Sequence, residues 1–383
     1  MAHDESEDTT IPPVNTVEAE QTRRRKLEHI EICLREDVQC RRSPMFEHVH
    51  LIHKALPEVD RDSIDLTVNF LGLRASAPLV IAAMTGGHPD TMEINRRLAE
   101  AAEELRIPIG VGSQRAAVED PTLEDTFRVV REVAPSVPVI ANIGATHVDA
   151  APAAVEMIEA DILAIHLNPL QEAIQPEGDC SSVGMLDSIA AIVESVDVPV
   201  MVKETGAGIS AQVAVALEEV GVAAVDVGGV GGTSWAAVEY YRALQENDEV
   251  KAQLGLDFWD WGIPTALSVL MVSEATDLEI VATGGVRSGL DVAKAIALGA
   301  TAAGVAYPLL QAAVEGTTRD VIVELEKIID GLKTAMYLTG CQTVDELGAI
   351  PIMFSAEMIA TLNSLGLDYA RFTRAWRRGV MFP

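Results

Sequence analysis

The stretch VATGGVRSGLDVAKAIALGA, residues 281–300, places a strand, a tight turn and a helix one after another. The apolar run that ends at Ala282 suits a fully buried strand. The two glycines that follow let the backbone turn sharply and let a ligand approach it. Ser288 and Asp291 have the spacing of a capping box, and apolar residues continue from there at helical intervals. The stretch therefore predicts one strand–turn–helix unit of an α/β fold.

The turn inside this unit also has the composition of an anion site. Free N–H groups at a helix start, with Arg287 beside them, most often bind phosphate, and a plain tight turn is the alternative. A second glycine loop, VGGVGGTSW at 227–235, adds backbone N–H groups and the hydroxyl of Thr233. We expect the two loops and the arginine to hold one phosphate group, such as that of flavin mononucleotide.

The alternation of short apolar runs with amphipathic helical stretches repeats from residue 78 onward. Near-continuous apolar strands separated by helices are typical of a parallel sheet. Eight such units over about 230 residues match a (β/α)8 TIM barrel. A doubly wound sheet is the alternative, although no GxGxxG follows the first run. The predicted strands are PLVIAAMT (78–85), IPIGVGS (107–113), PVIANIG (138–144), ILAIHLN (162–168), VPVMVKET (198–205), AAVDVGG (223–229), IVATGGV (280–286) and AAGVAYP (302–308).

Nearly every predicted strand ends in a glycine or a polar residue. In a barrel these ends collect at the C-terminal mouth, where barrel enzymes keep their active sites. A nearly complete ring of polar ends is hard to explain by packing, because buried polar groups cost free energy unless they are paired. The sequence therefore predicts a functional mouth. Its polar strand ends include Thr85, Ser113, Asn142, His166, Asn168, Lys203 and Glu204.

The composition excludes several classes of partner. The 383-residue chain carries 58 acidic and 28 basic residues, a formal charge of −30, which repels nucleic acid and anionic lipid. Only seven of the basic residues are lysine, and low lysine with excess carboxylate suggests a halophilic protein. The four cysteines lack metal-site and disulfide spacing. We see no secretory signal and no apolar membrane span, so we expect a cytoplasmic protein with reduced thiols.

Four segments are expected along the chain. Residues 1–22 are acidic and lack periodicity, which predicts a disordered tail. Residues 23–77 form an N-terminal extension that starts with RRRK and contains a short strand pair in DSIDLTVNFLGL. The barrel is expected over 78–316 and a C-terminal helical segment over 317–383.

Three groups of residues in the strand ends and the extension suggest chemistry. The loop HLNPLQE, residues 166–172, suits an Mg²⁺ ion that carries a diphosphate, with one protein carboxylate as ligand; a capped loop is the alternative. Lys203 needs a partner, which a Schiff base, a reduced flavin ring or a barrel carboxylate such as Glu204 would each provide. The arginines of SQRA (113–116) and RRRK (23–26) suggest an anionic substrate, although a solvated helix face is the alternative for RRRK.

Together these motifs resemble type 2 isopentenyl diphosphate isomerases, the flavin-dependent form, from about Arg24 to about Leu310. The set of HLNPLQE, RKLEH and MTGG is specific, because other flavin barrels lack it. The resemblance implies conversion of isopentenyl to dimethylallyl diphosphate in isoprenoid synthesis, without net redox change. It also implies FMN that is active when reduced, NADPH as reductant, Mg²⁺, and a homo-oligomer of four or eight subunits.

The resemblance also implies roles for individual residues. Gln171, Glu172 and His166 are the implied catalytic residues, with Gln171 near the reacting carbons and Glu172 as the Mg²⁺ ligand. Lys203 would neutralise the reduced flavin ring near N1. The implied FMN-binding residues are Ala83, Met84, Thr85, Ser113, Asn142, Lys203, Thr233, Gly285, Val286, Arg287, Ala306 and Tyr307. The implied substrate-binding residues are Arg25, Lys26, Ser113, Arg115, His166, Asn168 and Gln171.

Other functions share parts of this pattern. An α-hydroxy acid oxidase needs a histidine base after the late strands, but the last histidine is His166. An IMP dehydrogenase needs a cysteine on a late loop, and the late cysteine here, Cys341, lies well past the eighth run. A non-catalytic barrel that binds flavin or isoprenoid phosphates would not require Gln171, Glu172 and Lys203 together.

Overall fold

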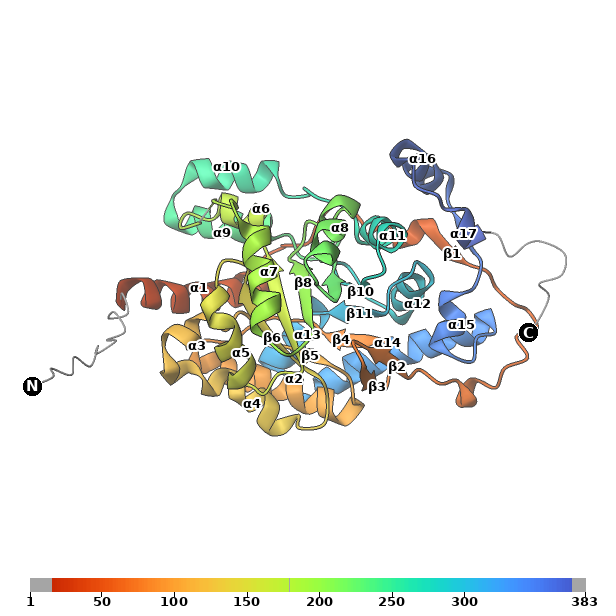
Figure 1. Cartoon of the computed structure of the whole chain (residues 1–383), viewed down its shortest axis with the longest axis horizontal. Coiled ribbons are helices and arrows are strands. Elements are labelled where there is room, and N and C mark those ends of the chain that lie inside the picture. Colours follow the sequence, from red (N-terminus) through yellow and green to blue (C-terminus); the bar gives the residue numbers. More distant parts are fainter. Residues whose placement is uncertain (1–15, 179, 374–383) are drawn as a thin grey trace, which may run out of the picture.

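The computed structural model describes residues 16–178 and 180–373, and its centre is a closed barrel of parallel strands (Figure 1). Each strand pairs with the next along the chain, and the last pairs with the first. This closure confirms the predicted (β/α)8 barrel, and the doubly wound alternative is wrong. The barrel strands are β4 (Leu79–Ile81), β5 (Ile109–Gly110), β6 (Val139–Gly144), β7 (Ile162–Leu167), β8 (Val200–Glu204), β9 (Ala224–Asp226), β10 (Glu279–Ala282) and β11 (Ala302–Val305).

The barrel strands are apolar because both of their faces are buried. All residues of β6 and of β11 are buried, as expected for a parallel sheet covered by helices. The antiparallel hairpin of β2 (Val68–Phe70) and β3 (Leu73–Ala75) is the strand pair predicted in the extension. Its Phe70 packs against side chains inside the barrel, such as Ile140 and Val281, and so closes one end of the core.

Helices surround the barrel, and the strand–turn–helix unit predicted at 281–300 is one of its repeats. Ser288 and Asp291 form the capping box expected at the start of the helix that follows β10. The helices are α1 (Thr16–Arg35), α2 (Met92–Leu105), α3 (Arg115–Glu119), α4 (Asp125–Val133), α5 (Ala151–Met157), α6 (Pro169–Ile174), α7 (Met185–Ser195), α8 (Ala211–Glu219), α9 (Trp235–Glu246), α10 (Glu249–Asp257), α11 (Thr265–Ala275), α12 (Gly289–Ala297), α13 (Tyr307–Glu315), α14 (Thr318–Thr339), α15 (Val344–Gly348), α16 (Ala356–Leu365) and α17 (Ala370–Thr373). Short 3₁₀ helices cover Phe46–His48, Arg61–Ser63, Pro89–Thr91, Pro121–Leu123 and Val148–Ala150.

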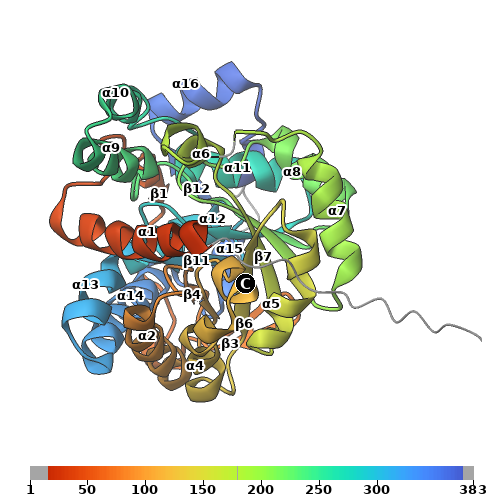
Figure 2. The same ribbon diagram turned by 90° about the vertical axis from the view of Figure 1, so that its left-hand side faces the viewer.

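The N-terminal extension reaches the mouth of the barrel through α1. This helix contacts α3, α9 and α13, and it crosses the barrel end in front of β11 (Figure 2). Residues 1–15 of the predicted disordered tail lie outside the described residues, and α1 already begins at Thr16.

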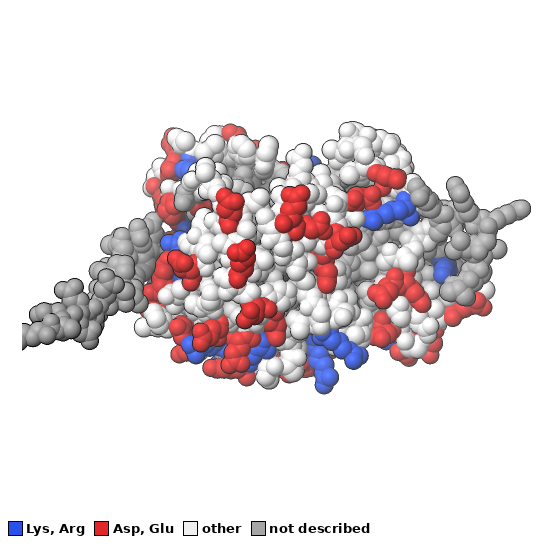
Figure 3. All heavy atoms as spheres, viewed as in Figure 1, with Lys and Arg blue, Asp and Glu red and all other residues white. Residues whose placement is uncertain are grey.

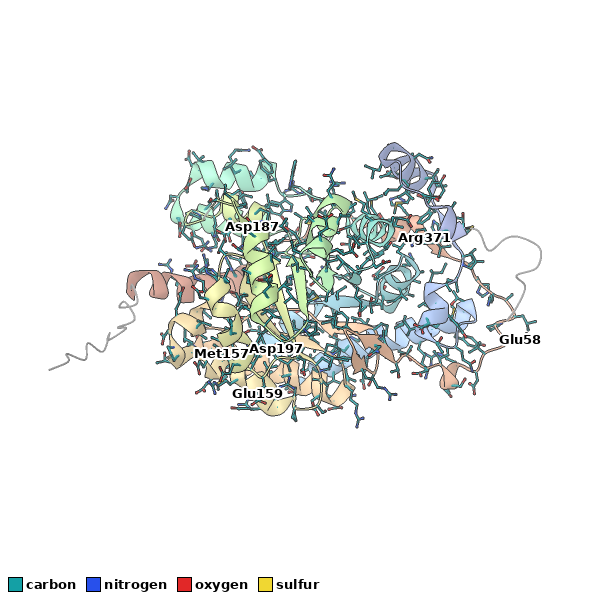
Figure 4. The ribbon with its side chains drawn as sticks, in the orientation of Figure 1. Glu58, Met157, Glu159, Asp187, Asp197 and Arg371 are labelled. Atoms are coloured by element: carbon teal, nitrogen blue, oxygen red, sulfur yellow. The ribbon has the colours of Figure 1, made fainter. Side chains whose placement is uncertain are left out.

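The C-terminal segment packs on the side of the barrel. Helix α14 contacts α2, α12 and α13. The segment also contains a strand that was not predicted, β12 (Ile352–Phe354), which pairs antiparallel with β1 (Val49–Leu51) of the extension. Arg371 of α17, labelled in Figure 4, donates a hydrogen bond to the carbonyl of Ser273 in α11 at 2.8 Å. The described helices after residue 317 therefore brace the barrel wall.

The close packing of α12 on α14 makes one glycine sensitive to substitution. A methyl group on Gly289 would collide with the backbone of Ile328 and Leu332. We therefore expect Gly289→Ala to lower the free energy of unfolding by about 1–3 kcal/mol or more, measured by urea unfolding. Gly348→Ala is the control, because its nearest neighbour would be 3.9 Å away. Equal stability of the two variants would contradict the expectation.

Acidic side chains are spread over the face seen in Figure 3, with basic side chains gathered in fewer places. Many of the described arginines pair with a glutamate one helical turn away, as Arg115 does with Glu119 and Arg128 with Glu124. Within the described part of the chain, no helix combines the length and the apolar character needed to cross a bilayer.

Candidate active site

A cavity of about 690 Å³ lies at the C-terminal ends of the barrel strands, beneath α1. Its size is that of a small-molecule site. Every residue that the sequence analysis assigned to a cofactor, substrate or metal lines this one cavity: Arg25, Lys26, Ala83, Met84, Thr85, Ser113, Arg115, Asn142, His166, Asn168, Gln171, Glu172, Lys203, Thr233, Gly285, Val286, Arg287, Ala306 and Tyr307. The barrel therefore brings together residues from all parts of the predicted mouth.

The two glycine loops lie backbone against backbone in the cavity wall. Gly284 and Gly285 have φ values of +99° and +77°, which favour glycine. A Cβ atom on Gly284 would overlap the backbone of Gly229, and one on Gly285 would overlap that of Gly231. The strand breaks at these glycines because two main chains must pass each other closely while their N–H groups stay near the cavity.

Arg287 lies beside these loops with its guanidinium fixed by protein groups. Its Nη2 donates to Gln39 Oε1 at 2.7 Å, its Nη1 donates to the carbonyl of Val286 at 3.0 Å, and the guanidinium lies 5.6 Å from the ring centre of Tyr307. Partial desolvation of the guanidinium lowers the pKa of Arg287 from its ordinary value. Gln39 was missed from the sequence, and its Nε2 is buried without a hydrogen-bond partner in the described structure. This donor-rich corner is suited to an anion.

Lys203 lies at the floor of the cavity and has a different partner from the one suggested by sequence. Its Nζ lies 3.8 Å from Asp226 Oδ2 and donates to the backbone carbonyl of Glu204 at 3.1 Å. The Glu204 carboxylate instead accepts hydrogen bonds from the backbone N–H groups of residues 206–208. Burial raises the pKa of Glu204 to about 7, although these amides and Lys203 oppose the shift. A salt bridge to Glu204 is thus wrong, and the barrel carboxylate is Asp226.

The surroundings of His166 favour its neutral imidazole form. Its Nδ1 lies 2.8 Å from Asn142 Oδ1, and the Asn142 amide donates to the carbonyl of Val111 at 3.1 Å. The Asn142 oxygen is therefore an acceptor, so Nδ1 of His166 carries the proton and Nε2 is left as an acceptor. Burial, with the charge of Lys203 as the next cause, lowers the pKa of His166 to about 3.

The segment 166–172, predicted as a loop, is the end of β7 and the start of α6, and carboxamides in and beside it orient Glu172. Asn168 Nδ2 donates to Glu172 Oε1 at 3.0 Å, and Gln175 Nε2 donates to Glu172 Oε2 at 2.7 Å. Gln171 Nε2 donates to Glu239 Oε1 at 2.9 Å. Neutral donors on Asn168 and Gln175 thus orient the Glu172 carboxylate.

Glu239 of α9 is the most important residue that the sequence analysis missed. It is fully buried and accepts hydrogen bonds from Gln171, from Arg242 Nη1 at 2.7 Å and from His29 Nε2 at 3.1 Å. Burial would raise the pKa of Glu239, but these partners lower it to about 2. A Glu–x–x–Arg pair within the otherwise apolar helix WAAVEYYRAL was the signal available in the sequence.

The basic cluster of α1 divides between solvent and cavity. The side chain of Arg24 is 78% exposed, so the solvated-face alternative holds for this residue. Arg25 lies 3.4 Å from Glu177, and Lys26 Nζ donates to the carbonyl of Ser113 at 2.9 Å. Burial and the neighbouring Arg25 lower the pKa of Lys26 to about 7.

Metal ligands are sparse in the cavity. Among the described residues, no three His, Cys, Asp or Glu side chains gather closely enough to hold a metal ion by themselves. An ion beside Glu172 would therefore need oxygen ligands from substrate or water, which is common for Mg²⁺.

Comparison with known proteins agrees with this geometry. The FMN-dependent dehydrogenase family matches residues 172–352. Solved structures with a similar fold include a lactate oxidase from Pediococcus acidilactici (15% identity, TM-score 0.62, 90% of this chain and 96% of that one) and a mandelate oxidase with (S)-4-hydroxymandelic acid (18% identity, TM-score 0.59, 88% and 99%). At these identities the likeness shows the fold alone.

The relatives of high identity carry one name. The isopentenyl-diphosphate delta-isomerase of Methanothermobacter thermautotrophicus is 52% identical over 350 residues, which cover 91% of this chain and 98% of that protein. The isopentenyl-diphosphate delta-isomerase of Archaeoglobus fulgidus is 54% identical over 342 residues, which cover 88% and 97%. The chain therefore belongs to the isopentenyl-diphosphate delta-isomerase family and is an isomerase built on an FMN-dependent barrel.

Proposed function

We propose that this protein converts isopentenyl diphosphate to dimethylallyl diphosphate, with reduced FMN and Mg²⁺ held in the mouth cavity and NADPH as reductant. The observation that carries the proposal is the division of one cavity into three parts. The glycine loops and Arg287 follow β9 and β10, Lys203 lies in β8, and Gln171 and Glu172 follow β7. These parts suit a nucleotide phosphate, an anionic ring and a metal-bound diphosphate.

The donor set fits FMN. Thr233, Gly285, Val286, Arg287, Ala306 and Tyr307 would hold its phosphate end, and Ala83, Met84, Thr85, Ser113 and Asn142 would lie beside its ring. Lys203 would place a cation against the anionic reduced ring. When bound, reduced FMN supplies an exchangeable proton for the allylic rearrangement. The guanidinium of Arg287, held beside the glycine loops by Gln39 and Val286, supports the assignment, because a fixed guanidinium favours an anionic partner.

The remaining residues would bind and orient the substrate. Arg25, Lys26 and Arg115 would neutralise the diphosphate together with an Mg²⁺ ion on Glu172, and His166 and Asn168 would complete the substrate site. The carboxamide of Gln171 is fixed by Glu239, so it would lie at a defined place beside the reacting carbons. The reaction adds one proton at the terminal methylene carbon and removes one two carbons away, and α1 over the mouth would exclude water meanwhile.

One assay tests this function directly. Purified protein is incubated anaerobically in molar KCl and D₂O with FMN, NADPH, Mg²⁺ and isopentenyl diphosphate, and the products are followed by proton NMR. Dimethylallyl diphosphate that forms only with reduced flavin and Mg²⁺ is the expected result. A protein that holds flavin but forms no product would refute the proposal and favour an oxidoreductase or a binding protein.

The lowered pKa of Lys26 makes substrate capture dependent on pH. Because the pKa of Lys26 in the free protein is about 7, its ammonium is present below that pH and is lost as the pH rises. We expect kcat/KM for isopentenyl diphosphate to fall above about pH 7, since this parameter reports the free enzyme. In Lys26→Arg the guanidinium stays charged, so the descending limb should move to higher pH. An unchanged limb would rule out Lys26 as its origin.

The acidic surface leads us to propose a protein adapted to concentrated salt. Added salt shortens the range of repulsion between surface carboxylates from about 10 Å at 0.1 M to about 3 Å at 1 M. The repulsion caused by the −30 net charge therefore becomes weaker. We expect the melting temperature to rise between 0.1 and 2 M KCl, with sorbitol of equal osmolality as control. A flat or falling curve in KCl would contradict the adaptation. A cytoplasmic location and assembly into four or eight subunits stay predictions.

A further inference from the structure

The floor of the cavity is built by three consecutive strands whose ends meet side by side. Lys203 of β8 and Asp226 of β9 are register partners in the parallel ladder. Asp226 is in turn the register partner of Val281 in β10, and Thr283 follows directly after that strand. Both Lys203 and Asp226 line the cavity. Neighbouring backbone positions therefore hold the ammonium and the carboxylate next to each other.

The carboxylate of Asp226 is locked in place on one side. Its Oδ1 accepts a short hydrogen bond from the Thr283 hydroxyl and another from the backbone N–H of Gly228 at 3.3 Å. Its Oδ2 faces Lys203 Nζ at 3.8 Å. The side chain of Asp226 is only 5% exposed, so it cannot turn away toward bulk water. Thr283 and Gly228 thus determine where the negative charge lies.

Other charged groups near Lys203 do not replace Asp226. Glu204, on the same strand, has its carboxylate occupied by the N–H groups of its own loop. His166 of the neighbouring strand β7 is neutral, and the residue that follows β10 is the uncharged Thr283. An ammonium that is 11% exposed has lost most of its hydration and needs an anion beside it.

We propose that Asp226, held by Thr283, is a positioning residue that keeps Lys203 protonated and fixed at the cavity floor, ready for an anionic ligand. An ammonium has three N–H donors, and one donates to the carbonyl of Glu204. The 3.8 Å separation from Asp226 is too long to engage the other two firmly. They remain available to a ligand in the cavity. The inference rests on the proposed function only in naming reduced flavin as that ligand.

Chemical modification of the FMN-free protein tests the protonation directly. Cyanate carbamylates only neutral amines, so the rate at Lys203, followed by mass spectrometry of the peptide between pH 6 and 9, reports its neutral fraction. We expect Asp226→Asn to react about tenfold faster than the parent at pH 8, since one pKa unit is a tenfold change. The exposed Lys327 in the same digest normalises for reagent. Equal rates at Lys203 in the two proteins would overturn the inference.

A second pair of variants guards against a folding defect in Asp226→Asn. Thr283→Val removes the hydroxyl that holds Asp226, and Thr283→Ser retains it. We expect Thr283→Val to raise the carbamylation rate at Lys203 by a few-fold and Thr283→Ser to match the parent. If Thr283→Val and Thr283→Ser behave alike, the hydroxyl has no such role and the inference fails.

Flavin binding supplies a readout that a merely structural ion pair would not change. The ratio of the dissociation constants of oxidised and reduced FMN is measured at pH 6 and pH 9 from the midpoint potentials of bound and free flavin. In Asp226→Asn the ratio of the oxidised to the reduced dissociation constant should be about tenfold lower at pH 9 than at pH 6, relative to the change in the parent. A loss that is equal at both pH values would indicate misfolding and contradict the inference. If the carbamylation rates and the flavin affinities change as expected but the parent protein forms no dimethylallyl diphosphate, the proposed function fails and this inference does not.

Discussion

Substitution of Glu172 by glutamine is expected to lower Mg²⁺-dependent kcat/KM at least ~100-fold while FMN binding stays unchanged. Mutation of residues that hydrogen-bond to a metal ligand typically lowers metal affinity or activity about 10–100-fold, so loss of the ligand itself should have a larger effect. The change removes the charge, and it also brings an amide against Asn168 and Gln175, which both donate to the carboxylate. Initial rates over a range of Mg²⁺ concentrations, with flavin fluorescence quenching for FMN binding, measure both quantities.

Glu194→Gln is the matched control for this variant. Glu194 is exposed on α7 and does not line the cavity. Its substitution by glutamine also removes one negative charge, but it leaves the site unchanged. We expect the control to retain parental kcat/KM and the same Mg²⁺ dependence. Full turnover by Glu172→Gln would show that the metal binds elsewhere.

Substitution of Arg242 by glutamine should lower the free energy of unfolding by about 3–5 kcal/mol, because it leaves buried carboxylates without their cation. Arg242 is 2% exposed and pairs with Glu239 at 2.7 Å, Glu177 at 3.0 Å and Glu28 at 3.2 Å. These carboxylates come from α9, from the loop after α6 and from α1. The guanidinium therefore joins the helix over the mouth to the wall that carries Gln171.

Urea unfolding of Arg242→Gln, with Arg319→Gln as control, tests this expectation. Arg319 is 62% exposed and pairs with Glu326, so its loss should cost at most about 1 kcal/mol. Similar destabilisation by the two substitutions would contradict a special role for the buried network.

Acid should weaken the same network in a defined pH range. The pKa of Glu239 falls from 4.5 to about 2 on folding, mainly through His29 and Arg242, which overcome the opposing effect of burial. Its ionisation therefore stabilises the fold above pH 4.5, and this contribution is lost as the pH falls toward 2. In Arg242→Gln the free energy of unfolding should therefore decrease less than in the parent as the pH falls from 4.5 to 2.

The number and order of the predicted barrel strands were correct because the information that specifies them is local, although most of the strands end before the predicted polar residues. Apolar runs such as VIANIG at 139–144 are buried on both faces of a parallel sheet, and the helices between them carry their own periodicity. The capping box of Ser288 and Asp291 likewise lies within one turn of helix. By contrast, the pairing of β1 with β12 joins segments from the two ends of the chain, and no local pattern specifies such a partner.

The sequence by itself determined the barrel and the polar strand ends at its mouth, because parallel strands of one barrel must all end at the same face. Only the tertiary structure decided which of these residues meet. It directed Lys26 into the cavity and Arg24 to solvent, and it gave Lys203 the partner Asp226 in place of Glu204. Such choices depend on how α1 crosses the mouth and how β8 lies in register with β9, and both depend on contacts between residues far apart in the chain.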